Sequence, residues 1–229
     1  MTTTLDAIRR ARLNPSIIIG GSLVGLVILA ALVSLVWTPY DPLPVEVAAR
    51  LQGSSAAHPL GTDRYGRDVL SILMAGARLT LLIGLSAVGL AAVLGVPAGI
   101  AAAMGGRRID ALLMRIADIG LAFPALLLVI VLGAAFGAGT STAVVALGVA
   151  AAPSFARVSR AGSLSVVARE YVTASRASGR PPLWIAVRHV LPNISGLPIV
   201  LAPVALSIPL LPRAALSFLG FAPPPPTPS

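Results

Sequence analysis

The sequence contains neither cysteine nor lysine in its 229 residues. Without cysteine, the chain can form no disulfide bond and no thiolate metal site. Without lysine, it cannot supply the phosphate-binding side chain of a GxxxxGK(S/T) loop, so it cannot hydrolyse ATP by that route. The two histidines, His58 and His189, lie far apart in the sequence and form no metal-ligand pattern. We therefore expect no metal site.

Charged side chains are also scarce. They make up 11% of the chain, against about 25% in a typical soluble domain, while hydrophobic residues make up 56%. The apolar runs are continuous, whereas the strands of a membrane barrel would alternate apolar and polar residues. The net charge of +9 comes from 17 basic residues, all arginine, which suits orienting loops better than nucleic-acid binding. The composition predicts an all-α integral membrane protein, a polytopic helical bundle in a lipid bilayer, with no nucleic acid among its partners.

Long charge-free runs predict five membrane-spanning helices, each of about 20 apolar residues. The first follows a basic tail, residues 1–16, and is too long for the apolar core of a signal peptide, so we expect an uncleaved anchor. Glycine and small polar residues at 133–142 divide the third apolar run into two helices. The predicted spans are residues 17–37, residues 79–106, two helices within residues 119–156, and residues 194–221.

The distribution of arginine predicts the orientation of these spans. Arginine clusters precede the first span, separate the second from the third, and lie between the fourth and the fifth. Placing these clusters inside gives a cytoplasmic N-terminus. The loop 38–78 then lies outside, and its four arginines are accompanied by four acidic residues. The proline-rich residues 222–229 also fall outside.

No ionisable residue lies at the centre of a predicted span, where a catalytic group would be costly and kept only for use. Asp118 stands near the start of the third span, three residues after Arg115, and we expect it in a surface or interfacial ion pair. Arg213, towards the outer end of the fifth span, is expected to snorkel or to contact a partner. We therefore expect no catalytic residue in this chain.

Three pairs of glycines, each four residues apart, predict close packing between helices of this chain. They are Gly21 with Gly25, Gly95 with Gly99, and Gly133 with Gly137. The spans are otherwise apolar all round, so their periodicity selects no substrate-binding residue.

A polar segment, residues 170–192, stands between two strongly apolar stretches. Residues 170–178 should form a short helix that Gly179 ends, because a C-terminal glycine can adopt positive φ. After a stiff arginine–proline–proline corner, a proline can begin a second helix over 183–190, which Leu191-Pro192 would stop. Two short helices at an angle on the cytoplasmic face, with small side chains on the first, would fit a groove on a partner.

The polar segment resembles the EAA loop of ATP-binding-cassette (ABC) importer permeases, whose pattern is E-A-A-x3-G-x9-I-x-L-P. Ala174, Gly179 and Leu191-Pro192 match this pattern, whereas Thr173, Ser175 and His189 replace its usual Glu, Ala and Ile. The resemblance implies that a cytoplasmic coupling loop, residues 157–192, docks in a cleft of an ATPase subunit and passes its motion to the membrane helices. The residues assigned to docking are Glu170, Thr173, Ala174, Ser175, Gly179, Arg180, His189, Leu191 and Pro192.

A second stretch, HPLGTDRYGRDVLSILMAGARLTL at residues 58–81, resembles the H-x-LGTDxxGRDxxSRxxxGxRxSL segment of dipeptide, oligopeptide and nickel permeases. We expect a turn at residues 61–63 and local ion pairs of Asp68 with Arg64 or Arg67. These would order the outer loop and the start of the second span without touching substrate. The residues of this loop motif are Leu60, Gly61, Thr62, Asp63, Gly66, Arg67 and Asp68.

A third stretch, AALSFLGFAPPPPTPS at the end of the sequence, resembles LSFLGLG…PPTPSWG, which leads to a sixth span in the same family. We therefore expect five spans to be present and a sixth to be missing. The chain as a whole is similar to the C-type permease of the dipeptide, oligopeptide and nickel ABC importers. This resemblance implies the fold of a type I importer permease, with its transmembrane core at residues 79–221.

The resemblance implies a transport subunit of the cytoplasmic (inner) membrane that is not itself an enzyme. Its implied partners are a second, homologous permease in a heterodimer, two ATPase subunits that bind ATP and Mg, and an extracytoplasmic substrate-binding protein. No cofactor is expected in this chain. The implied substrates are di- or oligopeptides, or alternatively nickel or another small solute.

Two other classes of function compete with an ABC permease. A stand-alone secondary carrier or channel would need polar or charged groups inside the membrane, and these are scarce here. A membrane-embedded enzyme would need a catalytic constellation, which the sequence does not offer.

Overall fold

The computed structural model describes residues 15–137 and 139–196, and these residues form helices and no β-strand. The predicted all-α class is thus confirmed. The described residues include only 194–196 of the predicted fifth span; the rest of that span, Arg213 and residues 222–229 lie outside them. The chain divides between Leu82 and Ile83 into two compact units.

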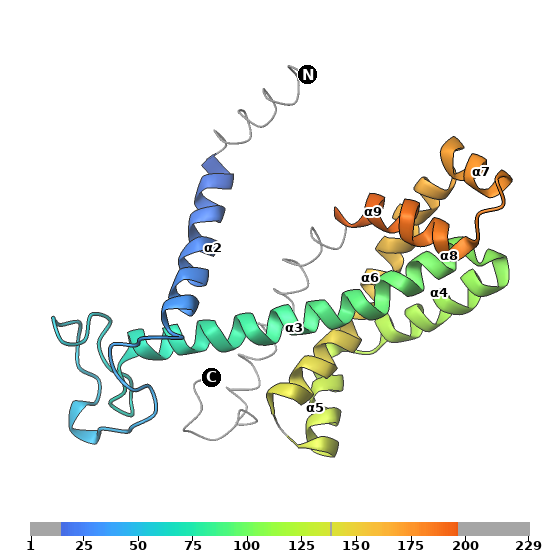
Figure 1. Cartoon of the computed structure of the whole chain (residues 1–229). Coiled ribbons are helices and arrows are strands. Elements are labelled where there is room, and N and C mark those ends of the chain that lie inside the picture. The colour runs from blue at the N-terminus through green and yellow to red at the C-terminus, as the bar shows by residue number, and fades with distance from the viewer. Residues whose placement is uncertain (1–14, 138, 197–229) are drawn as a thin grey trace. The chain divides into compact units, whose positions relative to one another are not determined.

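The first unit holds helix α2, Pro15–Val33, and the loop that follows it. Helix α2 is the blue helix of Figure 1. Its long apolar side chains are exposed around the helix, as expected for a helix that faces lipid. The predicted first span extended to Trp37, but α2 ends four residues earlier. The last turn tightens there, with Leu35 N–H donating to Leu32 O (3.1 Å), and Pro39 cannot continue a helix.

Helix α3, Val69–Met104, begins ten residues before the predicted second span. The earlier start follows from Asp68, whose carboxylate accepts hydrogen bonds from the backbone N–H (2.9 Å) and the hydroxyl (2.7 Å) of Ser71. These bonds cap the first turn of the helix. Its 36 residues continue through Pro97 and span about 54 Å, more than a hydrocarbon core of about 30 Å. At least one end of α3 therefore extends beyond the lipid tails.

The third predicted span, expected to begin at residue 119, is built differently. Helix α4, Gly106–Ala122, meets helix α5, Ala125–Phe136, at an angle of 82°. Phe123 is extended (ψ 124°) because Pro124 follows it, and this breaks the helix. The predicted division of the apolar run at 133–142 is confirmed, since α5 ends at Phe136 and the next helix begins at Thr140.

Helix α6, Thr140–Val167, is longer than the predicted fourth span, which ended at residue 156. Residues 157–167, expected in a loop, are helical because the buried face continues through Ser159, Ser163 and Val166 at helical spacing. The prediction stopped at the first arginine. A charged side chain on the exposed side does not end a helix.

Short helices make up the polar segment. Helix α7, Glu170–Ala177, is followed by Gly179 with a φ of 75°, which confirms the predicted end. Helix α8, Pro182–Ile185, begins after the extended Pro181, which confirms the predicted start.

The second arm of the polar segment is longer than predicted. After α8 it continues as a π-helical turn, η2 (Ala186–Val190), and then as helix α9 (Leu191–Ile194). The predicted stop at Leu191-Pro192 is wrong, because Pro192 lies in the first turn of α9, where a proline needs no backbone donor.

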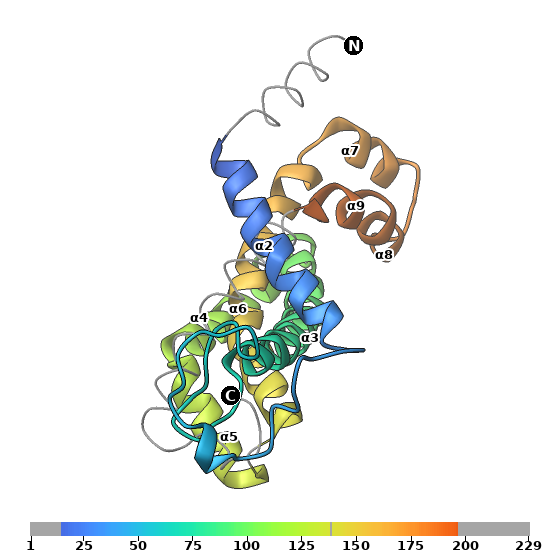
Figure 2. The same ribbon diagram turned by 90° about the vertical axis from the view of Figure 1, so that its left-hand side faces the viewer.

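The second unit is built around α6, which α4 and α5 both contact. Helix α5 lies near one end of α6, and the short helices α7, α8 and α9 lie at the other (Figure 1 and Figure 2). A buried apolar cluster joins these short helices to α6 and α3. Its residues are Ala91, Val96 and Ile100 of α3, Phe155 and Val166 of α6, and Val172, Ile185, Val190 and Ile194 of the short helices.

Helices α3 and α6 approach each other closely at two glycines. A Cβ atom at Gly95 would lie 2.5 Å from the carbonyl oxygen of Ala152, and one at Gly99 would overlap the carbonyl oxygen of Ala156. This pair therefore packs helices, as predicted. The pairs Gly21/Gly25 and Gly133/Gly137 do not, because Cβ atoms there would meet nothing within 4 Å in the described part of the chain.

Two of the described helices, α3 and α6, are long and apolar enough to cross a membrane. The bent pair of α4 and α5 would make a third crossing if it is one span. Helix α2 is apolar, but its apolar stretch Ile18–Val33 is shorter than those of α3 and α6. A helical membrane protein is thus confirmed as the class.

We expect Gly99→Ala to lower thermal stability, because the added methyl group would press on the α6 backbone at Ala156. Overpacking of this kind costs about 1–3 kcal/mol. Gly89→Ala on the same helix is the matched control, since a Cβ there meets nothing within 4 Å among the described residues. The measurement is the midpoint of thermal unfolding in detergent. Equal midpoints for both variants would contradict the close crossing.

Candidate functional site

The loop motif, residues 60–68, folds tightly around Asp63. The Asp63 carboxylate accepts hydrogen bonds from the backbone N–H groups of Tyr65 (2.8 Å) and Arg67 (2.9 Å). It also forms an ion pair with the Arg67 guanidinium, with 2.8 Å between Nη2 and Oδ2. Gly66, at a φ of 79°, lies so close to the carbonyl group of Glu46 that no Cβ atom would fit.

Two turns flank Thr62, where the sequence predicted a single turn at 61–63. Gly61 ends one turn and Gly66 ends the other, both at positive φ. Thr62 is buried; its hydroxyl accepts a hydrogen bond from Gln52 N–H (2.8 Å) and donates one to Ala49 O (2.5 Å). The motif is therefore tied to the stretch of loop that precedes it.

Asp68 is buried and bound to a histidine rather than to an arginine. Its Oδ1 lies 3.0 Å from His58 Nδ1. The predicted ion pairs of Asp68 with Arg64 or Arg67 are wrong. The guanidinium groups of both arginines lie instead over the Tyr65 ring, each 5.1 Å from its centre.

Hydrogen bonds keep both carboxyl groups of the motif ionised. Burial alone would raise the pKa of Asp68, but hydrogen bonds from Ser71 and His58 outweigh it and hold this pKa below its ordinary value. At Asp63, burial likewise raises the pKa, but hydrogen bonds from Arg67 outweigh it, so the pKa of Asp63 is lowered. Both carboxylates are engaged inside the loop, so their geometry favours an ordering role over catalysis.

Ser71 and Tyr40 complete this network, although sequence reasoning did not select them. Tyr40 N–H donates to Ser71 Oγ (3.0 Å), and the Tyr40 ring lies 4.7 Å from the His58 ring. The spacing of Ser71 from Asp68 could have indicated it: an acidic residue just before a helix often binds the residue three positions later, here the serine. Nothing local marks Tyr40, which stands 31 residues from Ser71.

The polar segment exposes one side of α7 and buries the other. Thr173, Ala174 and Ala177 are exposed, whereas Val172 is fully buried in the cluster that includes Val166 of α6. Most of the predicted docking residues are exposed, namely Glu170, Thr173, Ala174, Gly179, Arg180, Leu191 and Pro192. A helix with small outward side chains, anchored from below, has a shape suited to a groove.

Ser175 and His189, also predicted as docking residues, are half-buried and face each other. Ser175 Oγ lies 3.1 Å from His189 Nε2. The rings of Tyr171 and Trp184 lie 5.5 Å and 5.1 Å from the imidazole. These contacts join α7 to α8 and η2. Sequence reasoning missed Tyr171 and Trp184, for which the only signal was an aromatic residue in an otherwise polar segment.

Two ion pairs join α4 to α6. Arg160 binds Asp110 through two N–H groups, with Nε 2.5 Å from Oδ1 and Nη2 2.6 Å from Oδ2, and Arg157 pairs with Asp118. A bidentate pair of this kind fixes geometry as well as contributing energy. Sequence reasoning missed Asp110, because its partner is 50 residues away.

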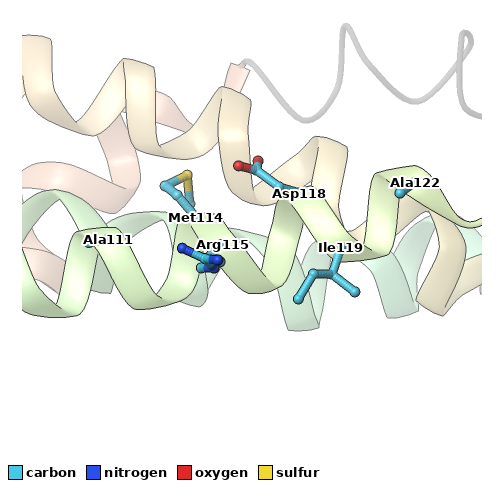
Figure 3. A pocket seen from close by; sticks show the side chains of 6 residues that line it. All are labelled: Ala111, Met114, Arg115, Asp118, Ile119 and Ala122. Atoms are coloured by element: carbon cyan, nitrogen blue, oxygen red, sulfur yellow. The ribbon is translucent and has the colours of Figure 1, made fainter.

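A shallow groove of about 510 Å³ runs along α4 (Figure 3). All its lining residues belong to this one helix, so it has no opposite wall and does not enclose a ligand; they are Ala111, Met114, Arg115, Asp118, Ile119 and Ala122. Figure 3 shows the side chains of Arg115 and Asp118 leaving α4 in different directions. The predicted ion pair of Asp118 is thus formed with Arg157 rather than with the neighbouring Arg115.

Comparison with known proteins gives a consistent result. A family model described as binding-protein-dependent transport system inner membrane component matches residues 95–227. The di/tripeptide transport system permease protein DppC of Pseudomonas aeruginosa is 40% identical over 217 residues, 92% of this chain and 72% of that protein. A putative peptide transport system permease protein of Brucella abortus is 40% identical over 218 residues, 95% of this chain and 73% of that protein. The dipeptide transport system permease protein DppC of Alkalihalophilus pseudofirmus is 36% identical over 215 residues, 94% of this chain and 71% of that protein.

We expect acid to open the loop motif. The pKa of Asp68 is lower in the folded loop than its ordinary value of 3.8. Its contribution to stability is therefore complete above that value and is lost as the pH falls through the folded pKa. The measurement is hydrogen exchange at the Ser71 amide, corrected for the intrinsic exchange rate, from about pH 6 to about pH 3. The Ser71 amide should lose its protection against exchange at the acid end of this range.

Asp68→Asn is the control for this titration, because an amide side chain does not ionise. In this variant the Ser71 amide should be less protected at the upper pH and should depend less on acid. The Tyr65 amide, which Asp63 holds, should behave as in the unchanged chain. An acid dependence at Ser71 as steep as in the unchanged chain would count against the role of Asp68.

We expect Asp110→Arg to lower the midpoint of thermal unfolding, because it places two guanidinium groups together between α4 and α6. The double variant Asp110→Arg with Arg160→Asp should recover part of the loss, since the charges are again opposite. Comparing the two midpoints with that of Arg160→Asp alone gives the coupling between the positions. Additive effects would show that the pair does not hold the helices together.

Proposed function

The chain belongs to the family of binding-protein-dependent transport system inner membrane components, and we propose that it is a permease subunit of an ABC importer for di- or oligopeptides. The peptide substrate is supported by the relatives, which are described as di/tripeptide, peptide and dipeptide permeases. The chain is proposed to span the cytoplasmic membrane with its N-terminus inside, as the arginine distribution favours.

ATP hydrolysis is assigned to partner chains. This chain has no lysine with which to build a phosphate-binding loop, so we propose that it is non-catalytic. The proposed partners are two ATPase subunits that bind ATP and Mg, a second homologous permease and an extracytoplasmic binding protein. The family description itself refers to a binding protein.

The construction of α7 is the observation that carries the coupling role. Its exposed side offers small side chains at Thr173, Ala174 and Ala177, which allow close approach by a partner surface. Its buried side is held by Val172, which is wholly enclosed. A helix that presents a smooth face and is firmly attached beneath it is suited to receive a push from a docked ATPase.

Packed contacts would carry that push into the membrane helices. Val172 shares a buried cluster with Val166, so a displacement of α7 acts on the end of α6. The ion pairs of Arg157 and Arg160 then connect α6 to α4. Coupling over a distance is most simply carried by such contiguous contacts. ATP binding in the partners would thus rock these helices between inward and outward states.

We expect Ala174→Trp to uncouple ATP hydrolysis from transport, because the large ring would keep a partner away from the exposed side of α7. The assembled complex in lipid nanodiscs is supplied with binding protein and a dipeptide. Its substrate-stimulated ATPase activity should fall about tenfold, the size of effect expected for a disruptive substitution at the centre of an interface. The matched control is Ala111→Trp, the same substitution at an exposed alanine of α4.

The same preparation separates the proposed function from its alternative. Peptide uptake that proceeds on an ion gradient, with no ATPase subunit present, would favour a stand-alone carrier. Unchanged coupling in Ala174→Trp, with normal assembly, would show that α7 is not the docking helix.

A further inference from the structure

His189 lies where the two arms of the polar segment meet. Its Nε2 is 3.1 Å from Ser175 Oγ on α7, and its ring meets Trp184 of α8 edge-on, at 81° and 5.1 Å. The Tyr171 ring of α7 approaches it from another direction, at 5.5 Å. Asn193 Nδ2 donates to the His189 carbonyl oxygen at 2.7 Å. The residue therefore contacts both α7 and the helical arm that follows it.

The hydrogen-bond donors decide which ring nitrogen carries a proton. Ser175 Oγ donates its single proton to the carbonyl oxygen of Tyr171 (2.8 Å), four residues earlier on α7. The contact at 3.1 Å is then a bond in which His189 Nε2–H donates to Ser175 Oγ. A chain of two hydrogen bonds thus runs from the imidazole into the backbone of α7.

The π-helical turn η2 is what brings His189 to Trp184. The two residues are five apart, and on a regular α-helix they would point about 140° away from each other. In η2 the backbone bonds close over five residues, as Leu191 N–H to Ala186 O shows, so residues five apart lie on neighbouring turns. Such π turns occur frequently at functional sites.

Apolar packing alone would leave one motion of α7 free. Val172 of α7 is buried in the same apolar cluster as Ile185 and Val190 of the second arm, and this shared burial resists separation of the two arms. Hydrophobic contact is non-directional, so it resists a small rotation of α7 about its own axis, one that keeps Val172 buried, much less. The corner between the arms passes through Gly179, at a φ of 75°, with open space around it among the described residues. A directional bond is needed to set the rotation.

We propose that His189 is a positioning residue that fixes the rotation of α7, so that the polar segment moves as one rigid body. The proposal rests on the coupling function proposed above. It also reassigns Ser175 and His189, which hold the docking helix in place instead of touching the ATPase.

Spin labels test the rigidity directly. The chain has no cysteine, so Arg176→Cys on α7 and Val187→Cys on η2, both exposed, give this chain two labelling sites when it is labelled before assembly. Neither position belongs to the small-residue side of α7 that is proposed to meet the ATPase. In the assembled complex the distribution of distances between the labels should be narrow, and equally narrow with and without ATP. His189→Ala should broaden it. His189→Gln, whose amide nitrogen replaces the Nε2 donor, should restore it, and Arg188→Ala, at the exposed neighbour, should leave it unchanged.

The unlabelled variants then link rigidity to transport. His189→Ala should lower peptide uptake per ATP hydrolysed by about fivefold, the factor that corresponds to losing one net hydrogen bond. His189→Gln should recover most of this loss. Ser175→Ala should match His189→Ala, and the double variant should be no worse than either, because both remove the same bond.

Two outcomes would overturn the positioning role. One is a label distribution that stays narrow in His189→Ala. The other is a broadened distribution with unchanged uptake per ATP. A different result would contradict the proposed function: ATPase activity of the complex with the unsubstituted chain that does not respond to peptide and binding protein. The label distances would still decide whether His189 fixes α7.

Discussion

The close crossing of α3 and α6 at Gly95 and Gly99 is the constraint on which the second unit depends. Apolar side chains gain little by leaving lipid for a protein interior, so membrane helices associate through close packing instead. At these two positions only a hydrogen atom separates the α3 backbone from the α6 backbone. Helix α6, located in this way, carries the ion pairs to α4 and, at its end, the apolar cluster under α7. A change in the position of α6 therefore alters the contacts of the helices that pack against it.

The two polar regions of the chain use their side chains in opposite ways. In the loop motif, the carboxylates of Asp63 and Asp68 bind backbone amides, an arginine and a histidine of the same loop. The result is a self-contained fold with ionised carboxylates at neutral pH. The polar segment instead turns its small side chains outward and uses only Ser175 and His189 to close its own geometry. The first arrangement is suited to holding a loop in shape, and the second to meeting another protein.

Local chemistry allowed much of the architecture to be predicted. Gly179 ends α7 and Pro181-Pro182 starts α8, because positive φ and a missing N–H are properties of single residues. Span ends were less predictable. The end of a charge-free run does not mark the end of a helix: α6 runs past Arg157 because its buried face continues. Helix α3 starts early because a side-chain cap reaches across three residues. The bend between α4 and α5 was missed, although Pro124 marked it.

The sequence by itself determined the class of protein, the presence of the polar segment and the residues that end and start its helices, Gly179, Pro181 and Pro182. These features follow from hydrophobicity and from the backbone preferences of single residues, which are local quantities. The sequence also carried the resemblance that led to the family. Only the tertiary structure decided which charges pair and which polar residues face inward. Asp110 meets Arg160 across 50 residues, Asp68 takes His58 in place of an arginine, and His189 turns to Ser175. Partners of this kind depend on how helices cross and on one π-helical turn. That turn moves His189 to the side of the helix where Trp184 and α7 lie.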